Sequence, residues 1–199
     1  MEQLNLFDYN PDLVIKKEPI LKMSEKVLEQ WKNLIFQHQQ EVIMEELSKP
    51  QQLKLFDLDS DSTRFNVNNI NPFSLLFYNS EFYEHKHQEY DDSNCIYFVI
   101  DNNLPLLLYI GQSQHSPKKR WKGNHDCKDY IFNYIELHRK YKITVEVVSA
   151  FYFNVPTERK LRQNLESELI EKWRSPFNRG KHSGVGVDKK GKVCITDKK

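Results

Sequence analysis

The sequence has little cysteine and no long apolar run, and each absence narrows the class of protein. Its three cysteines, Cys95, Cys127 and Cys194, are odd in number and far apart, so they do not form the framework of a disulfide-stabilised secreted domain. No apolar run approaches the roughly 18 residues that a membrane span requires. The first residues also lack the basic and apolar segments of a secretory signal. We therefore expect a cytoplasmic protein without a membrane partner.

Charge is distributed unevenly along the chain, although the net charge is only +1. Residues 1–93 contain 9 Lys/Arg and 17 Asp/Glu, whereas residues 94–199 contain 20 Lys/Arg and 11 Asp/Glu. A basic half suits a partner with a phosphate backbone, because Lys and Arg pair with phosphates and release counterions. The same bias is compatible with an ordinary solvated surface, so charge alone leaves nucleic-acid binding open.

The acidic half contains one predicted helix between less regular segments. Residues 1–22 lack a periodic pattern and residues 57–72 are rich in Asp and Asn, so we predict a flexible arm and a linker. Ser24 is a suitable N-cap, and apolar residues recur at helical spacing after it. We predict an amphipathic helix over 24–49 that packs on the rest of the chain or on a partner. The aromatic residues of 73–90 predict no particular element.

The basic half alternates strand and helix patterns. The predicted order is strand 96–100, strand 106–110, helix 125–141, strand 143–153 and helix 157–173. The first two strands flank turn residues and form a β-hairpin. We expect an α/β (α+β) fold with a small three-stranded mixed or antiparallel sheet flanked by helices. This domain spans 93–180, after an N-terminal region 1–92 and before a basic tail 181–199 that contains a small hairpin.

The last predicted helix carries a glutamate on its apolar face. At about 100° per residue, one half of this helix is formed by Leu161, Leu165, Leu169, Ile170 and Trp173. Glu166 falls inside that arc, whereas Glu168 and Glu171 fall outside it. A carboxylate among apolar side chains is unfavourable unless it pairs with a cation or holds a metal ion. The simpler alternative is a glutamate at the edge of the arc that reaches solvent or an arginine.

Other residues of the basic half could complete a site for phosphodiester chemistry. Such a site needs a hard cation held by carboxylate oxygen, a cationic side chain on the phosphate and a base near the attacking water. Glu166 and Arg120 meet the first two needs, and a Tyr–His group meets the third. The further candidates, on the hairpin and in the segment after it, are Tyr97, Tyr109, Gly111, Lys118, Lys119, Lys122 and His125.

These residues resemble the motifs of the GIY-YIG nuclease family over about 95–178, less than half of the chain. The paired signature that names the family is similar to Cys95-Ile96-Tyr97 and Tyr109-Ile110-Gly111, followed by Gln112-Ser113. The family's arginine segment and the histidine after it are similar to Lys119-Arg120-Trp121 and His125. The closing motif, in which Leu-Ile begins three residues after a glutamate, is similar to Glu166 through Leu169-Ile170 and Pro176-Phe177-Asn178.

Two positions depart from the family pattern. Cys95 stands where the signature has its first glycine, and we expect this to affect packing rather than chemistry. Four residues separate Arg120 from His125, whereas three are commoner in the family, and this puts the place of His125 in doubt.

The resemblance implies hydrolysis of DNA with one Mg²⁺ or Mn²⁺ ion bound to Glu166. It implies that Arg120 holds the phosphoryl oxygens and that Tyr97, with His125, deprotonates the attacking water. Tyr109 would assist by hydrogen bonding. Asn178 would tie the loop after the last helix to the site, and Lys118, Lys119 and Lys122 would contact DNA. The alternatives are core packing for the tyrosines and a simple loop cap for Asn178.

A zinc site is a weaker alternative. Its candidate ligands are His85, His87, Cys95, His125 and Cys127. They form His-x-His and His-x-Cys pairs, but no pair has the spacing of a closed zinc site.

Two peptides in the acidic half share a pattern of their own. Both read Gln-Leu-x-Leu-Phe followed by Asp: Gln3-Leu4-Asn5-Leu6-Phe7 and Gln52-Leu53-Lys54-Leu55-Phe56. The pattern resembles the motif by which bacterial repair and replication proteins dock on the sliding clamp. Leu and Phe would enter an apolar groove, Gln would fix the register, and two copies would raise the effective concentration. The alternative is that these residues pack on the protein's own core.

Together these patterns predict a DNA endonuclease of repair or replication, tethered to the sliding clamp and associated with the nucleoid. The alternative from another class is a non-catalytic DNA- or clamp-binding adaptor on a degenerate nuclease domain. Retention of Tyr97, Arg120 and Glu166 favours the enzyme.

Overall fold

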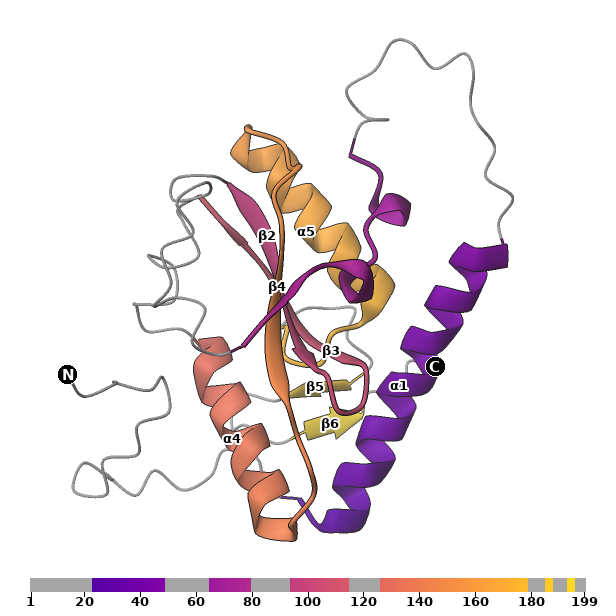
Figure 1. Cartoon of the computed structure of the whole chain (residues 1–199), viewed down its shortest axis with the longest axis vertical. Helices are drawn as coiled ribbons and strands as arrows, with labels where there is room; N and C mark the ends of the chain where they lie inside the picture. Colours follow the sequence, from indigo (N-terminus) through magenta and orange to yellow (C-terminus); the bar gives the residue numbers. More distant parts are fainter. Residues whose placement is uncertain are drawn as a thin grey trace, which may run out of the picture.

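The central element of the fold is an antiparallel sheet with the strand order β1-β4-β2-β3 (Figure 1). The computed structural model describes residues 23–48, 65–79, 94–114, 126–178, 185–187 and 193–195. The strands of the sheet are β1 (Phe77–Tyr78), β2 (Cys95–Asp101), β3 (Leu106–Ser113) and β4 (Val147–Tyr152). The expected α+β class is confirmed. The expected number of three strands is wrong, because β1 adds a fourth strand by pairing with β4.

Three long helices accompany this sheet: α1 (Glu25–Ser48), α4 (Asp126–Tyr141) and α5 (Arg159–Trp173). Each matches a predicted helix to within two residues at either end. Two short 3-10 helices, η2 (Val67–Asn69) and η3 (Pro72–Ser74), lie around the end of the expected linker. The expected hairpin of the tail is formed by β5 (Val185–Val187) and β6 (Val193–Ile195). None of the helices in the described part of the chain is long and apolar enough to cross a membrane.

Strand β2 is buried on both faces of the sheet and separates the core into two clusters. All seven of its residues are buried. The side chains of Cys95, Tyr97 and Val99 face a cluster that includes residues of α1 and α4. The alternate side chains from Ile96 to Ile100 face a cluster that includes residues of α5. Helices on both faces explain why β2 is a continuous apolar run rather than an alternating one.

Helix α1 packs on the chain itself, through apolar residues such as Leu28 and Trp31. Its fully buried Gln39 binds the backbone of β3: the Leu107 N–H donates to Oε1 over 2.8 Å, and Nε2 donates to the Leu107 carbonyl over 3.0 Å. The same Nε2 donates to the carbonyl of Trp173 over 3.1 Å. Gln39 therefore satisfies polar groups at the outer edge of the sheet, where no other strand of the described residues pairs.

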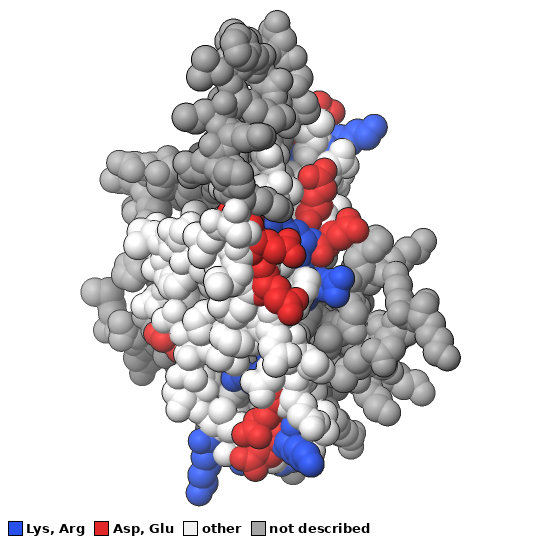
Figure 2. Space-filling model, turned by 90° about the vertical axis from the view of Figure 1, so that its right-hand side faces the viewer, with Lys and Arg blue, Asp and Glu red and all other residues white. Residues whose placement is uncertain are grey.

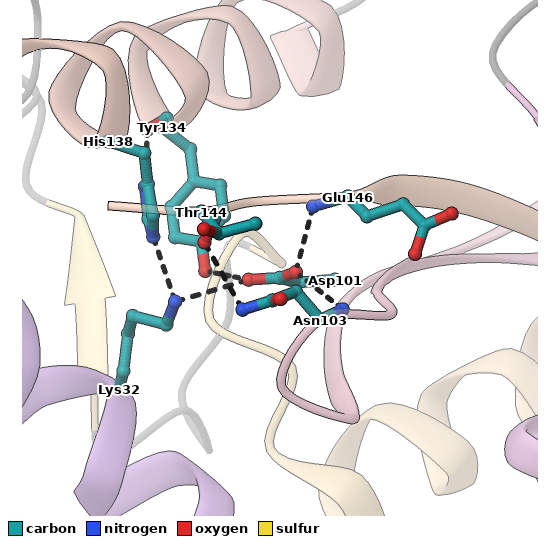
Figure 3. Close-up of polar contacts among 7 residues, drawn as sticks. All are labelled: Lys32, Asp101, Asn103, Tyr134, His138, Thr144 and Glu146. Carbon is teal, nitrogen blue, oxygen red and sulfur yellow. Dashed lines mark hydrogen bonds and ion pairs between the residues drawn. The ribbon is translucent and has the colours of Figure 1, made fainter. Parts of the chain in front are cut away.

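A buried polar network also fixes α1 against β2 and α4 (Figure 3). Lys32 Nζ lies 3.2 Å from Asp101 Oδ2 and 2.8 Å from His138 Nε2. Tyr134 donates its hydroxyl proton to Asp101 Oδ2 over 2.8 Å. His138 Nδ1 lies 2.8 Å from the Tyr134 carbonyl, which can only accept, so this nitrogen carries the proton. Its Nε2 faces the ammonium group of Lys32, which can only donate, so Nε2 accepts that hydrogen bond and His138 is neutral.

Candidate active site

Tyr97 crosses over Gly111, its partner on the neighbouring strand. The register of β2 and β3 pairs the two residues, and a Cβ added to Gly111 would lie 2.4 Å from both Cζ and the hydroxyl oxygen of Tyr97. The ring of Tyr109 lies beside that of Tyr97, with centroids 5.9 Å apart. Gly111 lies inside β3, which extends beyond the predicted strand 106–110. The close approach of Tyr97 is what requires glycine there.

Asn178 holds the backbone between Tyr109 and Gly111. The Ile110 N–H donates to Asn178 Oδ1 over 2.9 Å, and Asn178 Nδ2 donates to the Ile110 carbonyl over 2.7 Å. Ser175 also donates its hydroxyl proton to Asn178 Oδ1 over 2.6 Å. The side-chain amide of Asn178 thus forms the two hydrogen bonds that a neighbouring strand would form with Ile110. Through its bond with Ser175 it also caps the loop after α5.

Glu166 lies at the edge of the buried face of α5. The buried residues of this helix are Arg162, Leu165, Leu169 and Trp173. Glu166 is half-buried, whereas Glu168 is exposed. The expectation that Leu161 faces the core is wrong, because Leu161 is 44% exposed and Arg162 occupies the buried face in this turn of the helix.

Hydrogen bonds at both ends of α5 show how the helix runs along β3. Near the start of the helix, Arg162 Nε donates to Gln112 Oε1 over 2.9 Å. At its end, Gln39 Nε2 bridges the carbonyls of Trp173 and Leu107. The start of α5 therefore lies at the end of β3 and the end of α5 at its start, so the two elements are antiparallel.

The antiparallel packing of α5 on β3 determines which residue of β3 lies at the same height as Glu166 along the strand. From Arg162 to Glu166 the helix advances four residues, about 6 Å. From Gln112 back to Ile110 the strand covers two residues, about 7 Å. Glu166 is therefore level with Ile110. The two tyrosines lie on the sheet face covered by α1 and α4, and α5 covers the other face. Glu166 and the two tyrosines therefore lie on opposite faces of the sheet, and a shared substrate would have to reach around the edge of β3, which Asn178 occupies at Ile110.

The remaining candidates lie outside the described residues. For the phosphate and DNA contacts these are Lys118, Lys119, Arg120, Lys122 and His125. For the clamp peptides they are Gln3, Leu4, Leu6, Phe7, Gln52, Leu53, Leu55 and Phe56. The described part of the chain resumes with Asp126, the residue after His125 and the first of α4.

The donor chemistry of Glu166 fits a hard divalent cation. Mg²⁺ prefers oxygen ligands, retains several waters and is commonly held by one or two carboxylates together with phosphate oxygens. One half-buried glutamate next to a strand edge is therefore sufficient protein ligation. Within the described ranges, no group of three or more His, Cys, Asp or Glu could enclose a metal ion. Of the zinc candidates, Cys95 and Cys127 are buried, and the histidines lie outside these ranges.

Two features next to the candidate site did not follow from the motifs. Arg162 is 1% exposed and occupies a helical position four residues before Glu166, which its spacing from Leu165 and Leu169 could have revealed. Cys95 is fully buried, and burial raises the pKa of its thiol to about 12. The thiol is therefore protonated at neutral pH, in line with the packing role expected where the family has glycine.

A hollow of about 270 Å³ beside α1 has a different character. It is lined by His38, Glu41, Val42, Glu45, Glu46, Asn68 and Lys172. Figure 2 views this side of the molecule and shows acidic side chains gathered across the middle of the face. Lys172 pairs with Glu46, and its carbonyl lies 3.0 Å from His38 Nε2. A surface of this charge repels a phosphate backbone, so we do not assign it to DNA.

No family model, curated protein or solved structure matches this chain.

Proposed function

We propose that this chain is a DNA endonuclease that uses one Mg²⁺ or Mn²⁺ ion at Glu166, with a site similar to that of the GIY-YIG nucleases. The observation that supports the proposal is the antiparallel packing of α5 along β3, which sets the half-buried Glu166 at about the level of Ile110. The backbone there is fixed by Asn178 and flanked by Tyr109 and Gly111. Residues that are far apart in the sequence thus support a common place for a scissile phosphate.

Each side chain has one task in the proposed hydrolysis. Glu166 binds the cation, which when bound offsets the negative charge on the leaving oxygen. Arg120 holds the phosphoryl oxygens through charge-assisted hydrogen bonds. Tyr97 would act as its phenolate, whose formation the nearby cations favour, and would accept a proton from the attacking water, with His125 orienting that water. Tyr109 assists by hydrogen bonding.

The DNA backbone is held by Lys118, Lys119 and Lys122 in this proposal. These lysines belong to the basic half of the chain, and phosphate contacts of this kind make binding strongly dependent on salt. The acidic side chains around the hollow beside α1 direct the DNA to another face.

A non-catalytic adaptor is the second candidate, and the burial of Tyr97 favours it. Tyr97 is 1% exposed and belongs to a core cluster, so its ring also has a packing role. An adaptor would bind DNA or the clamp without cutting. Glu166 is only half-buried, so it remains accessible to a cation, which favours the enzyme.

Cleavage of supercoiled plasmid and branched DNA separates the two candidates. We expect the wild-type chain to nick DNA in Mg²⁺ or Mn²⁺ and to stop when EDTA is added. Glu166→Ala should bind the same DNA, measured by fluorescence anisotropy, without cutting it. Binding by the wild type with no metal-dependent cutting on any of these substrates would establish the adaptor instead.

We also propose that the two Gln-Leu-x-Leu-Phe peptides tether the enzyme to the bacterial sliding clamp. Phe7→Ala combined with Phe56→Ala should abolish retention of the chain on immobilised clamp, because both apolar anchors are lost. The matched control changes the variable position of each peptide, Asn5→Ala with Lys54→Ala, and should bind as the wild type does. Equal retention of both double variants would rule out docking through these peptides.

A further inference from the structure

Arg162 is a buried cation whose hydrogen bonds go to neutral groups. Its Nε donates to Gln112 Oε1 over 2.9 Å, and its Nη1 donates to the carbonyls of Pro156 and Thr157 over 2.9 and 3.1 Å. A guanidinium that is 1% exposed loses its hydration, and neutral acceptors restore only part of that energy. An apolar side chain such as Met would fill the same place on α5 without this desolvation. Stability alone therefore does not explain an arginine at this position.

The bond to Gln112 ties α5 to the residue that directly follows Gly111. Leu165 and Leu169 of α5 pack on the sheet in this region through apolar contacts. Apolar packing is not directional, so it resists sliding or rotation of a helix less than a hydrogen bond of fixed geometry does. Arg162 and Gln112 thus form the polar contact that fixes the start of α5 against the end of β3.

Glu166 follows Arg162 by one turn of the same helix, so the bond that fixes Arg162 also fixes the level of the glutamate. The two side chains interact electrostatically as well. Burial lowers the pKa of Arg162, and the negative charge of Glu166 raises it.

We propose that Arg162 is a positioning residue for the candidate nuclease: through its bond to Gln112 it holds Glu166 level with Ile110 beside Gly111. This inference rests on the proposed function of the site. Displacement of a reacting group by about 1 Å can lower a rate about 100-fold. Loss of the bond between Arg162 and Gln112 should therefore lower the rate of cleavage measurably.

Single-turnover cleavage as a function of Mg²⁺ concentration tests the role of Arg162. Arg162→Met keeps the length of the side chain and removes the bond, and Gln112→Leu removes the same bond from the other end. We expect each to raise the half-saturating Mg²⁺ concentration and to lower the maximal rate about 10- to 100-fold. Because both changes break one bond, the double variant should be no slower than the slower single variant. Arg162→Lys retains the positive charge but lacks the planar guanidinium group, so its cleavage should remain impaired.

Leu169→Ala is the matched control, because it weakens the packing of the same helix without touching the bond. Assayed where circular dichroism shows it folded, it should keep the wild-type Mg²⁺ dependence. If Arg162→Met does not fold, Gln112→Leu gives the same test from a half-buried position. Unchanged Mg²⁺ dependence in the Gln112 and Arg162 variants, or multiplied effects in the double variant, would overturn the positioning role alone. Absence of metal-dependent cutting by the wild type would overturn the proposed function and this inference together.

Discussion

The hydroxyl group of Tyr97 lies over the α-carbon of Gly111, so close that a methyl group there would be 2.4 Å from the tyrosine oxygen. Real side chains do not approach to this distance without displacement. The two residues belong to the two segments that resemble the paired signature, and the antiparallel register of β2 and β3 brings them together. The absence of a side chain at Gly111 thus leaves room for the ring of Tyr97.

Gly111→Ala should therefore displace Tyr97 and remove cleavage. Overpacking at this point should lower the free energy of unfolding by about 1–3 kcal/mol, measured with urea. Tyr97→Phe is the companion variant, because it retains the packing of the ring and removes only the proposed base. It should change stability by about 1 kcal/mol and still abolish cutting. Full cleavage by Tyr97→Phe would show that the hydroxyl group takes no part in the chemistry.

Asn178 should be sensitive even to an isosteric change. Asn178→Ala loses the bonds to both backbone groups of Ile110 and should lower the free energy of unfolding by about 1–3 kcal/mol. Asn178→Asp keeps the acceptor but faces the Ile110 carbonyl with a second oxygen, so it should be no more stable than the alanine variant. Asn164→Ala, at an exposed position of α5, is the control and should be neutral. Wild-type stability of Asn178→Asp would contradict the assigned orientation of the amide.

His138 should make the stability of the fold depend on pH. Burial lowers its pKa, and a proton on Nε2 would face the ammonium group of Lys32 at 2.8 Å. The unfolded chain, with a histidine pKa of about 6.5, then binds protons more readily than the folded chain. The contribution of His138 to stability is present above this value and is lost as pH falls below it toward the folded pKa.

Urea unfolding at a series of pH values between 7.5 and 5, all set by the experimenter, measures this dependence. His138→Gln retains an acceptor for Lys32 and cannot take up a proton, so its free energy of unfolding should fall less on acidification. The same fall in both proteins would assign the pH dependence to other groups.

Cys95 should be chemically inert in the folded protein. Burial raises its pKa to about 12 and keeps the thiol from solvent, so iodoacetamide at pH 8 should leave it unmodified. The control is the same chain in urea, where Cys95 should react fully. Peptide mass mapping measures both states, and equal modification of Cys95 in the two would contradict its burial.

The periodic elements of the fold were predictable because each carries a local pattern. The helices at 24–49, 125–141 and 157–173 were found to within two residues, since their apolar faces repeat every turn. Strand β1 was not predicted, because a strand of two residues is too short to show alternation. Its pairing with β4 also joins residues that are far apart in the sequence. Sequence alone also left open where α1 packs, because Lys32 and Gln39 find their partners only after folding.

The candidate site was predictable as a set of residues but not as a geometry. Helical periodicity placed Glu166 inside the apolar arc, whereas the structure has it half-buried at the edge of the buried face, as the simpler alternative expected. Its level at Ile110 depends on the bond between Arg162 and Gln112, which join elements 50 residues apart. No local pattern predicts such a contact, and a buried arginine is contrary to the usual preference of that residue for the surface.

The rate of DNA cleavage in single turnover, compared between Glu166→Ala and Glu168→Ala, tests the metal assignment most directly. Both variants remove one carboxylate from the same helix two residues apart, but Glu166 is half-buried at the edge of the buried face of α5, whereas Glu168 is exposed. With Mg²⁺ and both proteins shown to be folded, we expect Glu166→Ala to lose about 1,000-fold or more in rate. Glu168→Ala should keep the wild-type rate. Wild-type cutting by Glu166→Ala, or an equal loss in both variants, would contradict a nuclease site built on Glu166.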